Sequence, residues 1–238
     1  MSLLTRFFSR TYPLELDGFC DWHCHILPDV DDGIQSMDEA LDILSGYESA
    51  GIKEVWLTPH IMEDVPNTTE KLRSRFRELS DNYKGGIRLH LAAENMLDNL
   101  FKERLDADDL LPIGSERNML LIETSYFNSP MKFQETIEAI KAKGYFPLLA
   151  HPERYSYMDT MSTYRRLKEQ GVLFQLNLMS LCGHYGHIAK EKAHKLLMEG
   201  MYDRFGSDLH CYQHLDVIRA MKLPKSKLDV INKSEINL

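Results

Sequence analysis

The sequence lacks the features that mark secreted, membrane-spanning and nucleic-acid-binding proteins. Its four cysteines form no CxxC pair, so reduced thiols in a cytoplasmic protein are expected. No apolar run is long enough to cross a bilayer. The opening MSLLTRFFSR has no continuous apolar stretch and no small-residue cleavage site, which predicts a surface arm rather than a signal peptide. The net charge of −8 argues against a nucleic-acid groove, which needs a basic surface.

Two catalytic signatures are also missing. A cysteine-dependent tyrosine phosphatase needs a thiolate in a loop that ends with an arginine six positions later. The residues six positions after the four cysteines are Ile26, Val30, Ile188 and Val217. A glycine-rich nucleotide loop is absent too, and the pair Gly85–Gly86 is typical of a turn before a strand. The sequence therefore carries neither a phosphocysteine signature nor a glycine-rich phosphate loop.

Short β-rich runs alternate with amphipathic segments along the 238 residues, of which 43% are hydrophobic. Ser36 and Glu39 have the spacing of a capping box at the start of one predicted helix, which ends at Gly51. Residues 67–86 and 129–144 follow the same plan. This alternation predicts parallel strands joined by crossover helices.

The predicted strands end at regular intervals of 26 to 35 residues. A (β/α)8 barrel has roughly 31 residues per unit, so the spacing is typical of a barrel. Seven units can be counted, and no eighth strand follows the last of them. A seven-stranded, barrel-like parallel sheet is therefore predicted, with an open doubly wound sheet as the alternative. The predicted strand ends are His25, His60, Glu94, Glu123, His151, Asn177 and Asp208.

Six of these seven strand ends carry His, Glu or Asp, and side chains at the carboxyl ends of barrel strands converge on one face. His23 and His25 are two residues apart, so they point the same way from a strand. Asp208 and His210 repeat that spacing. One histidine alone would be read as a hydrogen-bonded core or surface residue. So many together favour metal binding, because neutral imidazole is the commonest metal ligand.

Imidazole and carboxylate without thiolate suit Mn, Zn, Fe or Co. The candidate ligands are too many for one ion, so a cluster of two or three ions bridged by Glu94 or Glu123 is expected. Such clusters polarise phosphoryl oxygens and generate hydroxide near neutral pH. Arg154 lies three residues beyond His151, where its guanidinium would bind a phosphate. A surface ion pair with Glu153 or another acid is the alternative.

Four other histidines are given simpler roles. His184 and His187 follow the sixth predicted strand and are expected to form hydrogen bonds at the rim of the site. His194 and His214 are predicted to be solvated helix positions. Tyr155 either stacks on a substrate ring or packs in the core.

An ordered set of motifs between Asp21 and His210 resembles the PHP family (polymerase and histidinol phosphatase). The motifs are DWHCHILPDVDDG, TPH, AAE, LIE, AHPERY and SDLH. The first of them, together with HPERY, resembles the manganese-dependent tyrosine phosphatases of bacterial capsule and exopolysaccharide loci. The resemblance implies a distorted, TIM-like, seven-stranded (β/α) barrel that holds three divalent ions. Mn²⁺ is the first expectation, with Fe, Zn or Co as alternatives.

Motif positions carry the family's metal ligands over to this chain. The first ion would be held by His23, His25, Glu94 and Asp208, the second by Glu94, Glu123 and His151, and the third by Asp32, His60 and His210. Asp31 is the alternative to Asp32. Arg154 matches the phosphate-binding arginine, and His210 is a candidate acid for the leaving group.

The resemblance also implies a biological role. The expected activity is that of a cytoplasmic, metal-dependent protein-tyrosine phosphatase. Its substrate would be the phosphotyrosine-bearing tail of a bacterial tyrosine kinase that regulates capsule or exopolysaccharide synthesis. A small-molecule phosphoesterase like histidinol phosphatase, or a catalytically silent metal-stabilised binding module, are the alternatives.

We expect a metallophosphatase domain over residues 17–222, an N-terminal arm over 1–16 and a polar C-terminal tail over 223–238. No nucleic acid and no membrane span is expected, and the oligomeric state is left open.

Overall fold

A computed structural model describes residues 10–114 and 118–236 of the chain. The strands are β1 (Thr11–Pro13), β2 (Cys20–Cys24), β3 (Glu54–Leu57), β4 (His60–Ile61), β5 (Arg88–Leu91), β6 (Glu94–Met96), β7 (Met119–Glu123), β8 (Phe146–Ala150), β9 (Leu173–Asn177), β10 (Arg204–Gly206) and β11 (Lys222–Pro224). The α-helices are α1 (Met37–Ala50), α2 (Thr69–Asn82), α3 (Asn99–Ala107), α4 (Phe133–Ala142), α5 (Met161–Glu169), α6 (Leu178–Cys182), α7 (His187–Met198), α8 (Tyr212–Ala220) and α9 (Lys225–Ile236). A 3-10 turn, η1 (Pro152–Arg154), follows β8.

Parallel strands form two sheets that continue each other. One has the order β10-β9-β8-β7-β6-β4 and the other the order β2-β3-β5. Short breaks separate β3 from β4 and β5 from β6, and the backbone bridges them: Ala92 N–H donates to the Leu57 carbonyl at 2.9 Å, and Glu94 N–H to the Pro59 carbonyl at 3.1 Å.

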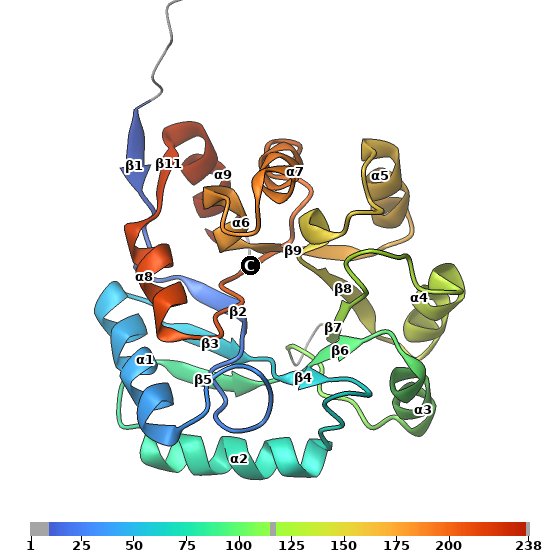
Figure 1. The fold of residues 1–238 in the computed structure, drawn as a ribbon, viewed down its shortest axis with the longest axis horizontal. Coiled ribbons are helices and arrows are strands. Elements are labelled where there is room, and N and C mark those ends of the chain that lie inside the picture. The colour runs from blue at the N-terminus through green and yellow to red at the C-terminus, as the bar shows by residue number, and fades with distance from the viewer. Residues whose placement is uncertain (1–9, 115–117, 237–238) are drawn as a thin grey trace, which may run out of the picture.

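The two ends of the sheet also meet. Asp208 N–H donates to the His23 carbonyl at 2.7 Å, and His25 N–H donates to the Leu209 carbonyl at 2.9 Å. Helices lie around the outside of the curled sheet (Figure 1). A curled, parallel α/β sheet is therefore present, as the strand–helix rhythm predicted, whereas the alternative of an open sheet with helices on both faces does not match this arrangement. The count of seven barrel strands stays a prediction.

Strand periodicity separates two apolar regions. Successive side chains of a strand point to opposite faces, so one set fills the inside of the curl and the other packs under the helices. The inner cluster consists of Ala92, Ile113, Met119, Leu121, Leu148 and Ala150, with Trp22, Trp56 and Leu173 packed against it. The intervening Leu120, Ile122 and Leu149 belong to the larger cluster. Apolar side chains fill the inside of the curl, and the polar side chains lie at the carboxyl ends of the strands.

The predicted helices are present with small differences. α1 begins after Ser36, whose side chain accepts from Glu39 N–H, and it ends at Gly51 with a φ of 93°. α2 lies inside residues 67–86, as predicted. α4 begins at Phe133 and not near Pro130, because Lys132 has a left-handed φ of 60° and residues before it form a loop.

The C-terminal segment differs from the predicted polar tail. Residues 225–236 form helix α9, in which Leu228 and Ile231 are buried. These side chains are three residues apart and share one helix face, which packs on the body of the protein. Within the predicted arm, β1 pairs antiparallel with β11, and residues 1–9 lie outside the described part.

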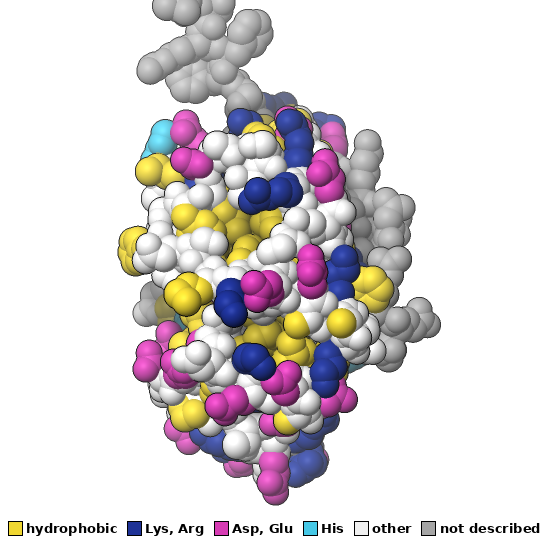
Figure 2. Space-filling model, turned by 90° about the vertical axis from the view of Figure 1, so that its right-hand side faces the viewer, with side chains coloured by type: hydrophobic (Ala, Val, Ile, Leu, Met, Phe, Trp, Pro, Cys, Tyr) yellow, Lys and Arg dark blue, Asp and Glu magenta, His cyan; other side chains and the backbone are white. Residues whose placement is uncertain are grey.

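The apolarity of the helices and the distribution of charge on one face bear on possible partners. In the described ranges, no helix combines the length and apolarity needed to cross a membrane. The face over α3, α4 and α5 carries Lys and Arg side by side with Asp and Glu, with apolar patches between them (Figure 2). This face offers no continuous basic patch to a polyanion.

Gly206, the last residue of β10, should not tolerate a side chain. A Cβ atom there would lie 2.6 Å from His23 Cβ and 2.7 Å from Gln175 Nε2. We expect Gly206→Ala to lower the thermal midpoint by roughly 2–12 °C, since overpacking a core costs about 1–3 kcal/mol.

Gly86→Ala is the matched control, because its added Cβ would meet only the flexible end of Glu48 at 3.1 Å. Thermal unfolding of both variants checks the prediction. Equal midpoints for Gly206→Ala and the unsubstituted protein would show that β10 does not press against His23.

Candidate metal centre

A cavity of about 310 Å³ opens at the carboxyl ends of the parallel strands. It is lined by Asp32, His60, Glu94, Tyr126, His151, Arg154, Tyr185, Asp208, His210 and His214. The buried His23, His25 and Glu123 contact these residues from below. We call the nine predicted ligands the histidine–carboxylate cluster: His23, His25, Asp32, His60, Glu94, Glu123, His151, Asp208 and His210. The structure brings all nine together around one cavity.

Four donor atoms converge at the base of the cavity. The Nε2 atoms of His23 and His25 lie 3.1 Å apart. Glu94 Oε2 is 3.1 Å from the former and 3.3 Å from the latter, and Asp208 Oδ1 is 3.5 Å from both. Two imidazole nitrogens and two carboxylate oxygens at these distances form a donor set for one divalent ion.

Glu94 divides its two oxygens between two groups of donors. While Oε2 faces His23 and His25, Oε1 lies 3.1 Å from His151 Nε2. Glu123 Oε2 lies 4.0 Å from the same His151 nitrogen. A carboxylate that reaches two donor groups can bridge two ions, as the sequence analysis expected of Glu94 or Glu123.

The third group lies at the mouth of the cavity. Asp32 Oδ1 is 3.6 Å from the Nε2 atoms of both His60 and His210. The Asp32 side chain is 72% exposed, so it is free to move toward an ion. Asp31 is instead engaged below, where its Oδ2 accepts from His25 Nδ1 at 2.8 Å and from His60 N–H at 2.9 Å. Asp31 therefore positions other donors, and Asp32 stays the predicted ligand.

Unpartnered buried atoms test whether the cluster suits metal ions. Among the residues that the structure describes, His60 Nδ1, Glu123 Oε1 and His151 Nδ1 are buried without a hydrogen-bond partner. His60 Nδ1 and Glu123 Oε1 lie only 3.1 Å apart, yet they form no hydrogen bond. Buried polar atoms left unpaired are unfavourable, and a cation between them would satisfy both. The donor set therefore fits divalent metal ions.

The compact donor groups differ in part from those that the resemblance implied. The triads and tetrads with ligand atoms within 4.8 Å are His23, His25 and Glu94; His60, Glu94 and Glu123; and His25, Asp32, His60 and His210. His25 and His60 each belong to two groups, because the imidazole rings are packed closely, with His25 and His60 centroids 4.4 Å apart. The division of ligands among three ions stays a prediction.

Protons on imidazoles balance the buried carboxylates. Burial lowers the pKa of His23, but neighbouring carboxylates, Glu94 first, overcome this effect and raise it to about 9. Burial opposes charge on His25 too, yet Asp31 holds its pKa well above the usual value. Burial favours a raised pKa for Glu94, but His23 and His60 hold that pKa well below its ordinary range. Cations of either kind, imidazolium or metal, therefore stabilise this end of the sheet.

His210 differs from these histidines. Burial and the nearby positive charge of His25 lower the pKa of His210 to about 4. Its Nδ1 lies 2.8 Å from the Asp208 carbonyl, which orients the ring. A neutral imidazole at pH 7 suits a metal ligand better than a proton donor.

Two amide side chains hold the cluster in place, and neither role was predicted from the sequence. Gln175 Oε1 accepts from His23 Nδ1 at 2.9 Å, so Nε2 is the His23 nitrogen that faces Glu94. Asn177, noted only as a strand end, donates from Nδ2 to Asp208 Oδ2 at 2.7 Å. Partners of this kind fix the tautomer and orientation of metal ligands.

Arg154 contacts the cluster and not Glu153. Its Nη1 donates to Asp208 Oδ2 at 2.8 Å. Glu153 is buried and accepts from Ser180 Oγ at 2.8 Å and from Tyr202 OH at 3.0 Å. The alternative of a surface ion pair with Glu153 is therefore wrong, although an ion pair with another acid, Asp208, is present.

The other predicted roles are met unevenly. His214 was expected to be solvated, but it lines the cavity, and its Nδ1 accepts from His210 N–H at 3.2 Å. The helix pattern of α8 could not show that its first turn packs beside the strand ends. Tyr155 is fully buried and belongs to the core. His187 is exposed and lies 3.5 Å from Glu191.

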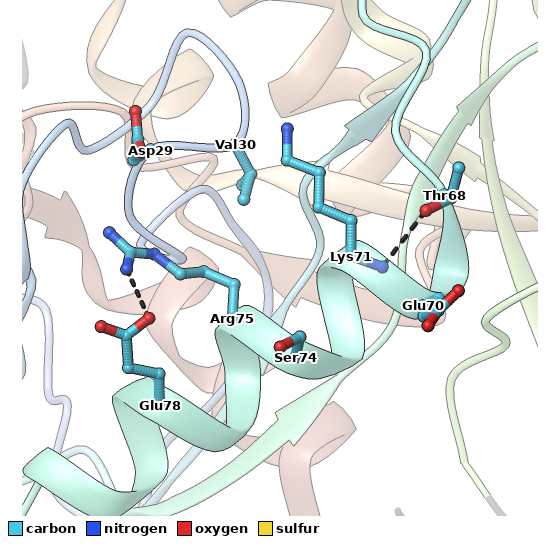
Figure 3. Close-up of a pocket in the computed structure, with 8 residues that line it drawn as sticks. All are labelled: Asp29, Val30, Thr68, Glu70, Lys71, Ser74, Arg75 and Glu78. Atoms are coloured by element: carbon cyan, nitrogen blue, oxygen red, sulfur yellow. Dashed lines mark hydrogen bonds and ion pairs between the residues drawn. The ribbon is translucent and has the colours of Figure 1, made fainter.

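The loop with Asp31 and Asp32 is anchored to α2. Arg75 Nε donates to the Pro28 carbonyl at 2.8 Å, and Arg75 Nη1 pairs with Glu78 at 2.6 Å. Asp29, Val30 and this part of α2 border a second, outer groove of about 450 Å³ (Figure 3). The groove contains none of the nine cluster residues, and the smaller cavity is therefore the candidate site.

Comparisons with known proteins agree with this geometry. The model of the family described as capsular polysaccharide synthesis, CpsB/CapC, matches residues 19–233. The putative tyrosine-protein phosphatase CapC of Staphylococcus aureus is 29% identical over 195 residues, covering 80% of this chain and 76% of the relative. The tyrosine-protein phosphatase CpsB of Streptococcus pneumoniae is 27% identical over 202 residues, covering 80% and 82%.

Solved structures show the same fold. One reported for YwqE from Bacillus subtilis and CpsB from Streptococcus pneumoniae, described as metal-dependent tyrosine phosphatases, has a TM-score of 0.75 at 23% identity. It covers 90% of this chain and 87% of that chain. The phosphotriesterase homology protein from Escherichia coli has a TM-score of 0.52 at 13% identity, covering 93% of this chain and 92% of that chain.

Metal affinity should rise with pH in the neutral range. An ion that binds His23 must displace its proton, and the pKa of His23 is about 9 without metal. Protonated His23 also stabilises the metal-free fold. This contribution to the free energy of unfolding is fully present below a pH of about 6.5, the pKa of histidine in the unfolded chain. That contribution is lost as the pH rises through about 9.

Manganese titrations between pH 7 and pH 9, with thermal unfolding of chelator-treated protein over the same range, check this expectation. A dissociation constant that does not change with pH would contradict it.

Gln175→Leu should weaken metal binding without changing a ligand. The substitution removes the acceptor for His23 Nδ1 while it keeps a side chain of similar size. Loss of such a partner reduces metal affinity by roughly 10–100-fold. Gln134→Leu is the control, because Gln134 is exposed and its side chain donates to Glu138 on the same helix, α4. Manganese affinity of the two variants is the measurement, and equal values would refute the role of Gln175.

Proposed function

Because the chain belongs to the CpsB/CapC family of capsular polysaccharide synthesis, we propose that it is a metal-dependent protein-tyrosine phosphatase. The observation that carries the proposal is the divided carboxylate of Glu94: its Oε2 lies 3.1 Å from His23 Nε2, and its Oε1 lies 3.1 Å from His151 Nε2. When bound there, divalent ions act as Lewis acids on phosphoryl oxygens and supply a nucleophile at neutral pH.

The finer features of the centre belong to this proposal. Three ions, Mn²⁺ before Fe, Zn or Co, are held by the histidine–carboxylate cluster. The divided carboxylate of Glu94 and the separate group around Asp32 support more than one ion. The scaffold is a distorted seven-stranded barrel, which the backbone bonds between His23, Asp208 and their neighbours support.

Residues of the chain have distinct tasks in the reaction. Arg154, fixed by Asp208, presents its guanidinium to the phosphate as a planar, permanently charged donor. His210 acts as a ligand, and its neutral state supports this role over that of an acid. The leaving phenolate requires little protonation, because the pKa of its conjugate acid is about 10.

The substrate is proposed to be the phosphotyrosine-bearing tail of a bacterial tyrosine kinase in the cytoplasm. The relatives' names as tyrosine-protein phosphatases and the family's place in capsule synthesis support this assignment. The cavity of about 310 Å³, which Tyr126 and Tyr185 help to line, suits a single side chain that carries a phosphate.

Hydrolysis of a phosphotyrosine peptide should require manganese and depend on two kinds of residue. His23→Ala should lose bound metal and activity together, because it removes a donor at the base of the cavity. Arg154→Ala should keep its metal and mainly raise KM for the peptide, because Arg154 lies above the donors. Elemental analysis beside steady-state kinetics separates the two outcomes.

Histidinol phosphate serves as the comparison substrate. Preference for it over the phosphotyrosine peptide would favour a small-molecule phosphoesterase. Stoichiometric peptide binding without phosphate release would indicate a catalytically silent module. Loss of metal from Arg154→Ala equal to that from His23→Ala would contradict the proposed division of tasks.

A further inference from the structure

Arg154 is enclosed by two tyrosine rings at the side of the cavity. Its guanidinium carbon lies 4.5 Å from the ring centroid of Tyr126 and 4.0 Å from that of Tyr185. Arg154 Nη1 is also bound to Asp208, and only 17% of the Arg154 side chain is exposed. An arginine that has two aromatic rings within cation–π distance and a hydrogen bond to a carboxylate has little freedom to rotate.

The two rings come from separate segments and are themselves fixed. Tyr126 lies in the loop after β7, and its ring stacks on that of the buried Tyr155 with centroids 6.0 Å apart. Tyr185 lies between α6 and α7, and its hydroxyl accepts from Asn177 Nδ2 at 3.1 Å. The same amide group donates to Asp208, so one side chain orients both a ring and the carboxylate that hold Arg154.

Charge alone does not require this enclosure. An arginine at an open rim would pair with Asp208 and still sample many rotamers, and binding phosphate would then have to restrict it. Burial raises the pKa of both phenols, so the rings stay neutral and their faces stay available to the cation. Both rings also line the cavity, so they direct Arg154 toward the place where a phosphate would lie.

We propose that Tyr126 and Tyr185 are positioning residues that hold the Arg154 guanidinium ready for the substrate phosphate. The inference rests on the proposed function, because it gives Arg154 a phosphate to bind. The tyrosines contact Arg154 through their rings and not through their hydroxyl groups. Their loss leaves the histidine–carboxylate cluster and its metal content intact.

Substitutions that remove the aromatic ring, compared with substitutions that keep it, distinguish this role from simple packing. Tyr126→Leu and Tyr185→Leu should each weaken orthophosphate binding and raise KM by roughly 2–30-fold, the range of a cation–π contact, with a smaller change in kcat. Tyr126→Phe and Tyr185→Phe should recover most of that affinity. Tyr145→Leu is the control, since Tyr145 is half-buried, bonds Asp108 and is not among the residues that line the cavity.

A double-mutant cycle tests whether the effect passes through Arg154. In an Arg154→Ala background, neither leucine substitution should weaken orthophosphate binding further. Isothermal titration of orthophosphate into manganese-loaded protein measures this directly, with elemental analysis and thermal midpoints as checks on folding and metal content.

Three results would overturn the inference: an equal loss in the Arg154→Ala background, phenylalanine variants as impaired as leucine variants, or no orthophosphate binding by the unsubstituted protein. Failure of the proposed function is a separate outcome. It would appear as orthophosphate binding with the predicted cycle but no hydrolysis of any aryl phosphate.

Discussion

Carboxylates buried together at one end of a curled sheet are the constraint on which the rest of this structure depends. Glu94, Glu123 and Asp208 are almost inaccessible to water, and an unpaired buried carboxylate is strongly unfavourable. Imidazole rings surround them, and the lowered pKa of Glu94 and the raised pKa of His23 describe the same attraction from both sides. Positive charge must be present at this end, and metal ions are the cations for which its donor atoms are arranged.

The remainder of the fold keeps those donors in register. Apolar side chains fill the inside of the curl below the cluster, so the polar side chains are confined to the carboxyl ends of the strands. Gly206 allows β10 to approach His23, and Gln175 and Asn177 fix a histidine and an aspartate from one neighbouring strand. Helix α2 holds the loop of Asp31 and Asp32 through Arg75. Each contact is local, but together they determine where the donor atoms lie.

The arginine that we propose binds the substrate also contacts the histidine–carboxylate cluster. Asp208 faces His23 and His25 with one oxygen and Arg154 with the other, so the arginine that we propose binds phosphate shares a carboxylate with the base of the cavity. Membership in the CpsB/CapC family and the fold shared with metal-dependent tyrosine phosphatases give this arrangement a chemical meaning. The acidic protein can then receive an anionic ester because the local charge, not the net charge, governs the cavity.

The sequence by itself predicted the parallel α/β fold and eight of the nine candidate ligands, because strand periodicity and strand-end residues are local signals. Asp32, a loop residue, was implied only by the resemblance to the PHP family. Only the tertiary structure decided that Asp31 faces inward while Asp32 faces the cavity, since their loop has no period from which direction can be read. It also placed Gln175, Tyr126, Tyr185 and His214 around the site, where isolated polar or aromatic residues carry no signature of their own. The helix over residues 225–236 was not predicted for a related reason. Two apolar residues in a polar segment indicate a packed helix only when the surface that buries them is known.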